Sequence, residues 1–510
     1  MTSIFKKAKQ NPHRKRCFSL GRPEAEAETQ SEGPLSIKNL FVDEMHVMDA
    51  LNDSKFIISG RKGTGKTAIK SYIILNSKPE DQTLLSYEID PRIILSETIR
   101  EDIQDFSQRV TLMSQWCIVS AIINMILDTD QGPSTPEIQN LAKLRKKYLD
   151  LFTIDDIVKF GKIERRTMSV NLLKGPFGAL FSKEETRDDS KPQPFYRFIN
   201  PLTKVIEKVL SMQVFEDYEF KVLIDNLDIG FDLFRREHCD ALLALIRSAR
   251  DFNNRPAIRD HAQVILFIRD DVRRHLGGMD SDPSKMFGSY ELPLIWYEGK
   301  NISDINLRLR RFVNKRIAEN FTRNRMPYFR EDPWKSYVEE REEYDDSDSP
   351  KSVFRRILDY TFFRPRDLIN LFLPLDTVEY QLPLSRDNIK KLLRDYSEKV
   401  FDELKDELKI KYPAEEYSSI ISIISKIAKL DEQNPNGIDR KDVELLLPED
   451  KAPEIIREFY DYDILGYIDN NGDRHFHCRN SMPVIPVEEC RLVMPRILKL
   501  YFNRSYRIKI

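Results

Sequence analysis

Cysteine and histidine are scarce in this sequence. Its 510 residues include five cysteines and seven histidines, and the cysteines show no paired spacing. This pattern gives no indication of a disulfide framework or a zinc site, and no local Ser-His-Asp or Cys-His signature is present. His475 and His477 alternate on one expected strand and share a face, but two imidazoles do not complete a metal site.

Long apolar runs are also missing. The most apolar stretch, Trp116 to Leu127, is shorter than the ~20 residues that span a bilayer. It contains Ser120 and Asn124, so we expect a buried helix and no membrane partner. The N-terminal 28 residues lack the apolar segment of a secretory signal. The sequence therefore predicts a cytoplasmic protein.

Neither sign of charge is in clear excess. The chain has 81 Lys and Arg against 83 Asp and Glu, a net charge of -2. A protein that coats nucleic acid through bulk positive charge is excluded, so any contact with nucleic acid must be local. The composition, 41% hydrophobic and 32% charged, is typical of a soluble globular protein. A chain of 510 residues predicts two or three domains rather than one.

Short apolar runs in the first 300 residues have the length of buried strands. They are Lys55–Ser59, Phe220–Ile224 and Val264–Ile268. Helical patterns such as Cys239–Arg250 lie between them, and this alternation predicts an α/β core over residues 35–300, with a parallel sheet and flanking helices. The phosphate-loop motif described below makes this an expected P-loop NTPase core. Residues 128–194 interrupt the order, and we expect an insertion bounded by loops.

The two flanks of this core have different patterns. Residues 1–34 change from basic to acidic without apolar periodicity, which predicts a mobile arm. After Trp296 apolar residues recur at helical spacing and predict an all-helical lid over residues 301–411. Three helices and two short strands around an Asn-Gly turn predict a winged-helix domain at residues 412–480. Residues 481–510 read as a basic tail.

The segment Gly60–Thr67 matches G-x-x-x-x-G-K-[ST] in full, after an apolar strand and before a helical pattern. Its glycines allow backbone N–H groups to turn toward phosphate oxygens, and Lys66 can reach the terminal phosphates. We expect Thr67 to hold a magnesium ion. The predicted nucleotide-binding residues are Gly60, Arg61, Lys62, Gly63, Thr64, Gly65, Lys66, Thr67 and Ala68.

An acidic strand end supplies the second half of this predicted site. Asp225 ends an apolar strand, and on a strand beside that of the phosphate loop its carboxylate can orient magnesium. Asn226 follows it where many P-loop enzymes have a second acid. The general base is therefore Asp228 or lies elsewhere, and Asp228 is equally suited to cap a helix. We expect slow hydrolysis, or none without a partner.

Two arginines are candidates to sense the γ-phosphate. Arg269 ends the third predicted strand and would lie near the phosphate if that strand is next to the acidic one, but it can also pair with Asp270 or Asp271. Arg366, favoured over Arg364, begins a helix of the lid and can bind phosphate in a bidentate way. The alternative for Arg366 is a salt bridge between domains.

Taken together, these features resemble bacterial P-loop ATPases related to the STAND class and to AAA+ initiators of the origin-recognition type. The resemblance covers roughly residues 18–480 and rests on Leu20–Glu28, Gly60–Ala68, Asp225 with Asp228, Arg269 with Asp271, Trp296 and Arg364–Ile369. It implies ATP and Mg²⁺ as ligands, and a lid and winged helix that respond to the nucleotide. The sequence departs from the pattern of this family in two ways. Asn226 stands where a second acid is usual, and the 159 positions from Lys66 to Asp225 exceed a minimal core. The absence of a repeat array after the winged helix argues against a large STAND receptor.

Three functions follow as hypotheses. The first is an ATP-binding, slowly hydrolysing switch that engages a protein partner, with a role in antiphage defence or stress, and with oligomerisation left open. The second is a non-hydrolysing, nucleotide-dependent scaffold. The third is a DNA-engaging initiator or loader, which the acidic helix after Pro453 disfavours. Basic residues are found instead in the tail and in the stretch 302–330, which could line a channel for nucleic acid but is favoured to dock on the acidic loop at residues 342–348. Preference for ATP over GTP follows from the resemblance alone.

Overall fold

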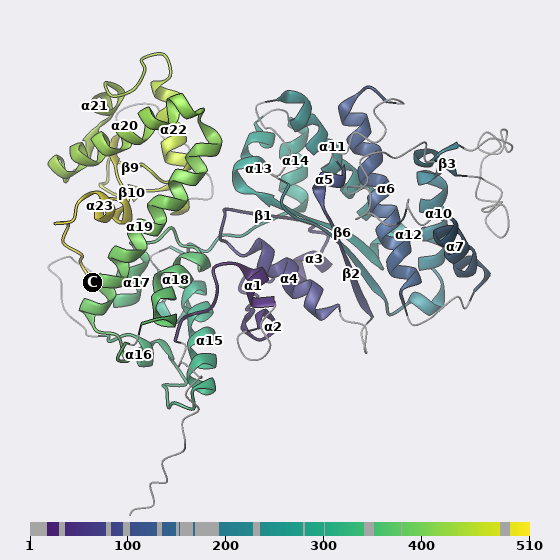
Figure 1. The fold of residues 1–510 in the computed structure, drawn as a ribbon, viewed down its shortest axis with the longest axis horizontal. Helices are drawn as coiled ribbons and strands as arrows, with labels where there is room; N and C mark the ends of the chain where they lie inside the picture. Colours follow the sequence, from purple (N-terminus) through teal and green to yellow (C-terminus); the bar gives the residue numbers. More distant parts are fainter. Residues whose placement is uncertain are drawn as a thin grey trace, which may run out of the picture. The chain divides into compact units, whose positions relative to one another are not determined.

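The chain folds into two compact units. The structure, a computed structural model, describes residues 18–29, 36–77, 83–94, 103–129, 135–148, 152, 167–168, 193–227, 235–278, 281–299, 301–340, 351–378, 380–479 and 490–510. We call residues Asp43–Leu294 the sheet unit, and Met1–Val42 together with Ile295–Ile510 the helical unit. Figure 1 shows the elements of both units along the chain.

A five-stranded sheet forms the centre of the sheet unit. Every pair of neighbouring strands is parallel, in the order β2-β5-β6-β1-β7. The strands are β1 (Ile57–Gly60), β2 (Leu84–Ile89), β5 (Glu219–Ile224), β6 (Ala262–Arg269) and β7 (Glu291–Pro293). The predicted α/β core with a parallel sheet and flanking helices is confirmed. The edge strands β2 and β7 were not predicted, because both are largely half-buried and carry polar residues.

Helices cover both faces of this sheet (Figure 1). The described helices of this unit are α3 (Val47–Asn52), α4 (Lys66–Asn76), α5 (Pro91–Ile94), α6 (Phe106–Leu127), α7 (Pro136–Lys147), α10 (Ile199–Leu210), α11 (Arg236–Asn253), α12 (Pro256–Arg259), α13 (Asp270–Gly277) and α14 (Ser281–Tyr290). Alternation along β5 assigns the faces: Val222 and Ile224 join the apolar cluster of α6 and α11, and the buried Leu223 points to the other face. Helix α4 contacts β1 and β2.

Helix α6 is longer than the apolar stretch from which it was predicted. It begins at Phe106, where the Asp105 side chain caps it by accepting a hydrogen bond from the Gln108 backbone N–H (2.6 Å). At 22 residues it is long and apolar enough to cross a membrane by composition alone. Most of its side chains are nevertheless buried, and it packs against α10 and α11, as expected for a core helix.

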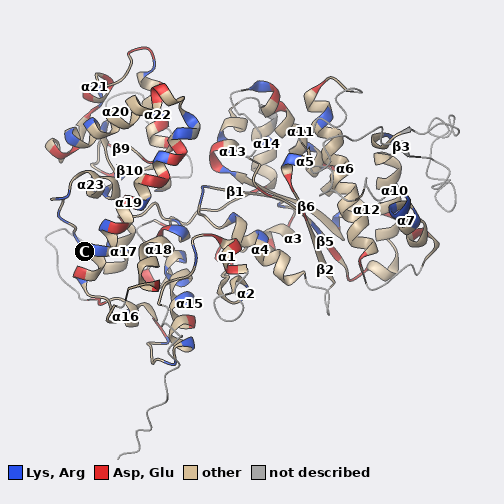
Figure 2. Ribbon diagram, viewed as in Figure 1, with Lys and Arg blue, Asp and Glu red and all other residues tan. Residues whose placement is uncertain are grey.

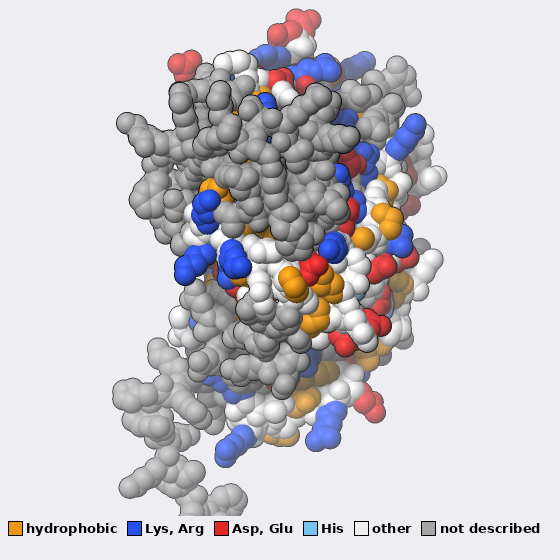
Figure 3. All heavy atoms as spheres, turned by 90° about the vertical axis from the view of Figure 1, so that its right-hand side faces the viewer, with side chains coloured by type: hydrophobic (Ala, Val, Ile, Leu, Met, Phe, Trp, Pro, Cys, Tyr) orange, Lys and Arg blue, Asp and Glu red, His pale blue; other side chains and the backbone are white. Residues whose placement is uncertain are grey.

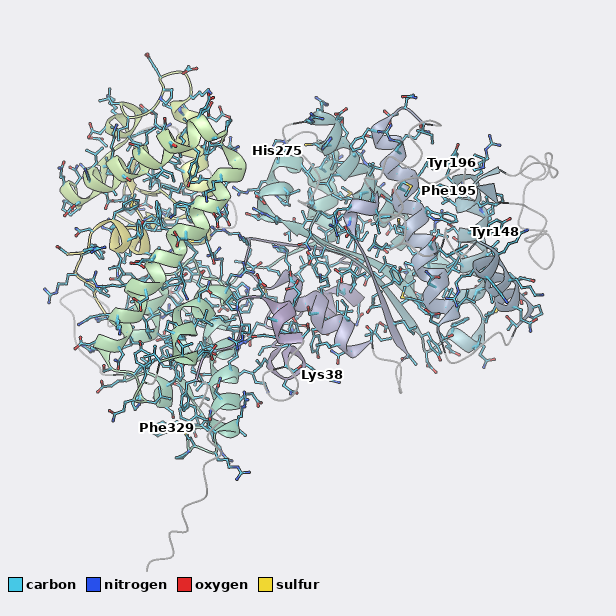
Figure 4. The ribbon with its side chains drawn as sticks, in the orientation of Figure 1. Lys38, Tyr148, Phe195, Tyr196, His275 and Phe329 are labelled. Atoms are coloured by element: carbon cyan, nitrogen blue, oxygen red, sulfur yellow. The ribbon has the colours of Figure 1, made fainter. Side chains whose placement is uncertain are left out.

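The described ends of the predicted insertion belong to the core of the sheet unit. Helix α7 buries Ile138, Leu141 and Leu144 in the same apolar cluster as α6. At the far end, the Phe195 ring lies 4.9 Å from that of Trp116, centroid to centroid (Figure 4). Two short strands, β3 (Thr167–Met168) and β4 (Gln193–Pro194), pair antiparallel. Most of the remaining insertion lies outside the described residues.

In the helical unit, the described part of residues 301–411 is built of helices, as predicted for the lid. They are α15 (Arg308–Arg323), α16 (Trp334–Tyr337), α17 (Val353–Leu358), α18 (Pro365–Phe372) and α19 (Arg386–Lys411). One isolated bridge, Val338 to Leu384, interrupts the helical pattern. The buried Trp334 and Tyr337 of α16 pack on Phe372 of α18 and join α16 to the shared core.

The expectation of a mobile arm over residues 1–34 is wrong for residues 18–29. This segment ends in α1 (Ala25–Thr29) and packs on the helical unit, where Leu20 is fully buried. Glu28 forms a buried ion pair with Arg316 of α15 at 2.6 Å. A second short helix, α2 (Ile37–Leu40), contacts α15. The alternating charges that suggested a solvated arm are thus partly buried and paired. Residues 1–17 lie outside the described residues.

The C-terminal elements combine helices with a small antiparallel sheet of order β10-β9-β11-β8. They are α20 (Ala414–Gln433), β8 (Ile438–Asp439), α21 (Arg440–Glu444), α22 (Ala452–Asp461), β9 (Gly466–Ile468), β10 (Arg474–His475), β11 (Arg491–Val493) and α23 (Arg496–Phe502). The three helices and the hairpin agree with the sequence. The prediction of a basic tail is wrong over residues 490–510, because β11 pairs with β9 and α23 buries Ile497 and Leu498.

Candidate functional site

The loop between β1 and α4 has the shape that its glycines predict. Gly63 and Gly65 have positive φ angles of 85° and 103°, which residues with a Cβ rarely adopt. A Cβ on Gly60 would lie 2.5 Å from the Thr64 hydroxyl, so this position also requires glycine. The Thr64 hydroxyl donates to the Arg61 carbonyl at 2.8 Å. The chain is therefore held in a tight turn that leads directly into the N-terminus of an 11-residue helix.

Lys66, the first residue of α4, turns back over this loop. Its ammonium donates to the carbonyl oxygens of Gly60 at 2.6 Å and Arg61 at 3.1 Å. The positive charge thus lies at the mouth of the loop, beside the helix N-terminus whose partial charge has the same sign. Two positive features at one point form an arrangement that attracts phosphate.

The carboxylate of Asp225 lies against the start of α4. Asp225 directly follows β5, and only 3% of its surface is exposed. The Thr67 hydroxyl is 3.3 Å from Asp225 Oδ2, and the Asn226 backbone N–H donates to Oδ1 at 2.8 Å. Asn226 has a φ of 58°, in the left-handed region that asparagine tolerates better than most residues. The structure therefore places the two predicted magnesium ligands, Thr67 and Asp225, side by side, and their binding of magnesium stays a prediction.

Two further charged residues, which sequence reasoning missed, complete this cluster. The Lys70 ammonium lies 3.2 Å from Asp225 Oδ2 and 2.7 Å from Glu88 Oε1. Lys70 is buried, and Glu88 is exposed near the end of β2. Burial opposes the charged form of Lys70, but its contacts with Glu88 and Asp225 prevail and raise its pKa. The available sequence signal was the spacing of Lys66 and Lys70, which places both on one face of a helix.

The order of the strands corrects one expectation about Asp225. Its strand β5 is not beside the phosphate-loop strand β1, because β6 pairs with both and lies between them. Pairing partners of this kind are set by long-range contacts that the local pattern does not contain. The condition on which the role of Arg269 depends, that β6 lies next to β5, is met. In the register, Arg269 at the end of β6 is opposite Gly60.

Arg269 forms the local ion pair that the sequence offered as its alternative role. Its Nε and Nη2 atoms donate to the two carboxylate oxygens of Asp271 at 3.0 and 2.7 Å. Burial acts to raise the Asp271 pKa, but the neighbouring Arg269 guanidinium outweighs it and lowers that pKa. The role of Arg269 as a γ-phosphate sensor stays a prediction.

The remaining predicted residues lie outside the described part of the sheet unit. Arg366 belongs to the helical unit, where its Nε donates to the Pro23 carbonyl at 3.1 Å. Arg364 is buried and binds Asp367, the residue that caps α18. Asp228 lies outside the described residues. The lid role of Arg366 and the catalytic role of Asp228 therefore stay predictions.

The oxygen donors at the end of β5 suit a magnesium ion. Mg²⁺ prefers hard oxygen ligands and usually combines one or two protein groups with substrate phosphates and water. The Thr67 hydroxyl and the Asp225 carboxylate provide such a pair beside the phosphate loop. Two further members of the predicted nucleotide-binding set are Lys62, which lies in the loop, and Ala68, which lies in the first turn of α4. No family model matches this chain, and no curated protein matches it.

The charges of α22 and of the C-terminal segment bear on the DNA hypothesis. Helix α22 exposes Glu454 and has half-buried Glu458 and Asp461, and Figure 2 shows acidic segments along it. Two cations of the supposed tail are already engaged, Arg496 with Asp359 at 3.6 Å and Lys499 with Asp431 at 2.6 Å. On the face shown in Figure 3, Lys and Arg side chains are scattered among acidic and apolar ones.

Proposed function

We propose that this protein is a P-loop ATPase that works as a nucleotide-dependent switch. The proposal rests on one arrangement: a glycine-shaped loop closed by Lys66, with the Thr67 hydroxyl 3.3 Å from the buried Asp225 carboxylate. A cationic loop at a helix N-terminus suits the phosphates of ATP, and paired oxygen donors beside it suit Mg²⁺. ATP as the nucleotide follows from the resemblance to STAND and AAA+ ATPases.

Each residue of the arrangement has a separate task in this proposal. The backbone N–H groups of the loop bind phosphate oxygens, and Lys66 leaves the loop carbonyls to contact the terminal phosphates. Thr67 and Asp225 orient the magnesium ion, which supplies charge neutralisation on the phosphates when bound. Asn226 carries no carboxylate to accept a proton from water, so turnover is slow or depends on a partner.

The proposed regulation rests on the resemblance. In STAND and AAA+ proteins a helical lid and a winged helix respond to the nucleotide, and the helical unit has the helices and the small antiparallel sheet from which such domains are built. The proposed partner is another protein, in antiphage defence or a related stress response. Arg366 is the proposed lid arginine that reports the γ-phosphate.

Calorimetry with K66A tests nucleotide binding. We expect wild type to bind ATP with Mg²⁺ and K66A to lose at least about tenfold in affinity, because a charge-assisted contact to phosphate is removed. Lys55 at the entrance to β1 is the matched control, since its ammonium binds the Ser289 carbonyl, and K55A should retain wild-type affinity. Well-folded wild type that binds no nucleoside triphosphate contradicts the proposal.

Phosphate release separates this proposal from a non-hydrolysing scaffold, which Asn226 favours. Turnover by wild type above that of K66A supports the ATPase. Binding of ATP without turnover, with and without DNA, supports the scaffold. The DNA-engaging alternative requires a duplex shift at low salt that weakens steeply as salt rises. The acidic surface of α22 predicts that no such shift occurs.

A further inference from the structure

Lys70 occupies an unusual place at the proposed magnesium site. Its ammonium lies between two carboxylates, 3.2 Å from Asp225 and 2.7 Å from Glu88. The contacted Asp225 oxygen, Oδ2, is the same one that lies 3.3 Å from the Thr67 hydroxyl. Lys70 and Asp225 are buried, so water does not screen these two charges as it would on a surface, whereas Glu88 is exposed. The Asp225 carboxylate therefore already has a protein cation beside it.

The strand register explains why three charges meet here. Glu88 of β2 is opposite Leu223 of β5, which places Glu88 and Asp225 two residues apart on the same face of the sheet. Helix α4 covers this face, and Lys70 is one turn beyond Lys66 on the helix. Without Lys70 the two carboxylates would carry two uncompensated negative charges close to the phosphates of a bound nucleotide.

A fixed ammonium and a magnesium ion have overlapping electrostatic effects at this position. Both reduce the repulsion between Asp225 and phosphate oxygens, and each weakens the attraction of the carboxylate for the other. The ammonium is covalently held on a packed helix, so it is present whether or not magnesium is bound. Glu88 is exposed and also binds Lys70, so it sets how much of the ammonium charge acts on Asp225.

We infer that Lys70 is a built-in counter-ion of Asp225 that reduces the dependence of nucleotide binding on magnesium. This inference rests on the proposed function, and it states how strongly nucleotide binding at the same site depends on the metal ion. Lys70 is a positioning residue in this account, because it acts through Asp225 and not on the nucleotide. Glu88 also binds the Lys70 ammonium, and this weakens the effect of the ammonium on Asp225.

The test uses two dissociation constants for ATP, both measured by calorimetry. The ratio is the constant in excess EDTA divided by the constant in excess Mg²⁺, so a larger ratio means a stronger dependence on magnesium. Replacing Lys70 by methionine keeps the length of the side chain and removes the charge. K70M should raise the ratio at least about tenfold over wild type, since site-to-site couplings commonly fall between 5- and 150-fold. K221M is the matched control, because Lys221 is a half-buried lysine on β5, paired with Glu219. Its ratio should equal that of wild type.

E88Q provides a second, independent measurement at an exposed side chain. Removing the Glu88 charge leaves the Lys70 ammonium to Asp225 alone, so the ratio should fall below that of wild type. K70R, which keeps the charge, should stay close to wild type. If K70M does not fold, the direction of the change in E88Q decides the matter, and an unchanged or higher ratio in E88Q contradicts the inference.

The outcomes also separate this inference from the proposed function. Wild type that binds ATP, K66A that does not, and K70M with an unchanged ratio would leave the ATP site standing and remove the role of Lys70. Wild type that binds no nucleotide under either condition would overturn both.

Manganese alone gives a further readout: K70M, with two carboxylates freed, should bind Mn²⁺ more tightly than wild type in the absence of nucleotide.

Discussion

Asn226 shows how a backbone requirement can favour one residue type beside the carboxylate that we propose to bind magnesium. Its φ of 58° is left-handed, and its N–H holds Asp225 Oδ1 at 2.8 Å. A β-branched side chain is strained in this conformation by about 1–2 kcal/mol, whereas glycine is not. N226V should therefore lower the free energy of unfolding by that amount, and N226G should stay within about 0.5 kcal/mol of wild type. Urea unfolding measures both, and equal losses in the two variants would contradict the argument.

The sequence predicted the local half of the site and missed the long-range half. Gly60–Thr67 could be predicted because the glycines, the lysine and the hydroxyl are consecutive in the chain, and the acid at Asp225 could be predicted from the end of an apolar run. The contact of Lys70 with Glu88 depends on which helix face covers which strand. Nothing in either segment alone specifies this. For the same reason the pairing of Arg269 with Asp271 could only be offered as one of two alternatives.

At the scale of elements, α1 is attached to α15 by a buried ion pair. The side chains of Glu28 and Arg316 are 3% and 4% exposed, and Arg316 also donates to the Leu20 carbonyl. Removing only the carboxylate would leave a buried, uncompensated guanidinium, which costs about 3–5 kcal/mol. E28L should lower the stability of the helical unit by that amount in denaturant unfolding.

The control for this prediction is an exposed pair on the same segment. The Arg22 side chain binds Asp376 at 2.7 Å and is 55% exposed, so R22A should cost only about 0–1 kcal/mol. The double variant E28L/R316L should recover part of the loss of E28L, because no charge then stays buried. A double variant less stable than E28L would show that apolar packing, and not the charge, dominates at this contact.

Strands could be predicted from the sequence where every residue is apolar and buried, and they could not be predicted where they are short or only partly buried. The central strands β5 and β6 are apolar on both faces, so their sequences stand out as runs. Strands β8 and β11 are two and three residues long and pair with segments far away in the chain, which leaves no local signal. The segment around Leu20 was taken for a mobile arm because its charges suggested solvent, whereas its partner Arg316 lies almost 300 positions away.

At the scale of the whole molecule, the helical unit should lose stability in acid. The Asp359 carboxylate is contacted by Lys351 at 2.9 Å, Arg479 at 3.2 Å and Arg496 at 3.6 Å. Burial acts to raise its pKa, but these three cations prevail and lower it. A carboxyl whose pKa is lower in the folded state stabilises the fold above its unfolded pKa of about 4, and this contribution is lost as pH falls through the folded value.

Urea unfolding between pH 7 and pH 3 measures this contribution. D359N has no carboxylate to protonate, so its unfolding free energy should be lower at pH 7 but should fall less steeply in acid than that of wild type. E216Q is a surface control, because Glu216 is exposed and its removal should leave the pH profile of wild type. Parallel profiles for wild type and D359N would exclude Asp359 as a source of acid sensitivity.

The two units have separate apolar cores, and this predicts two unfolding transitions. One core joins residues from Phe56 to Phe287, the other joins Leu20 with residues from Leu307 to Ile510. ATP with Mg²⁺ at about 100 times its dissociation constant stabilises its own unit by about 2.7 kcal/mol, which raises the melting temperature of a domain of this size by roughly 5–10 °C. Calorimetry of wild type should show this shift in the transition of the sheet unit, K66A should abolish it, and D359N should lower the transition of the helical unit. A shift of both transitions by the nucleotide would mean that the cores are energetically coupled.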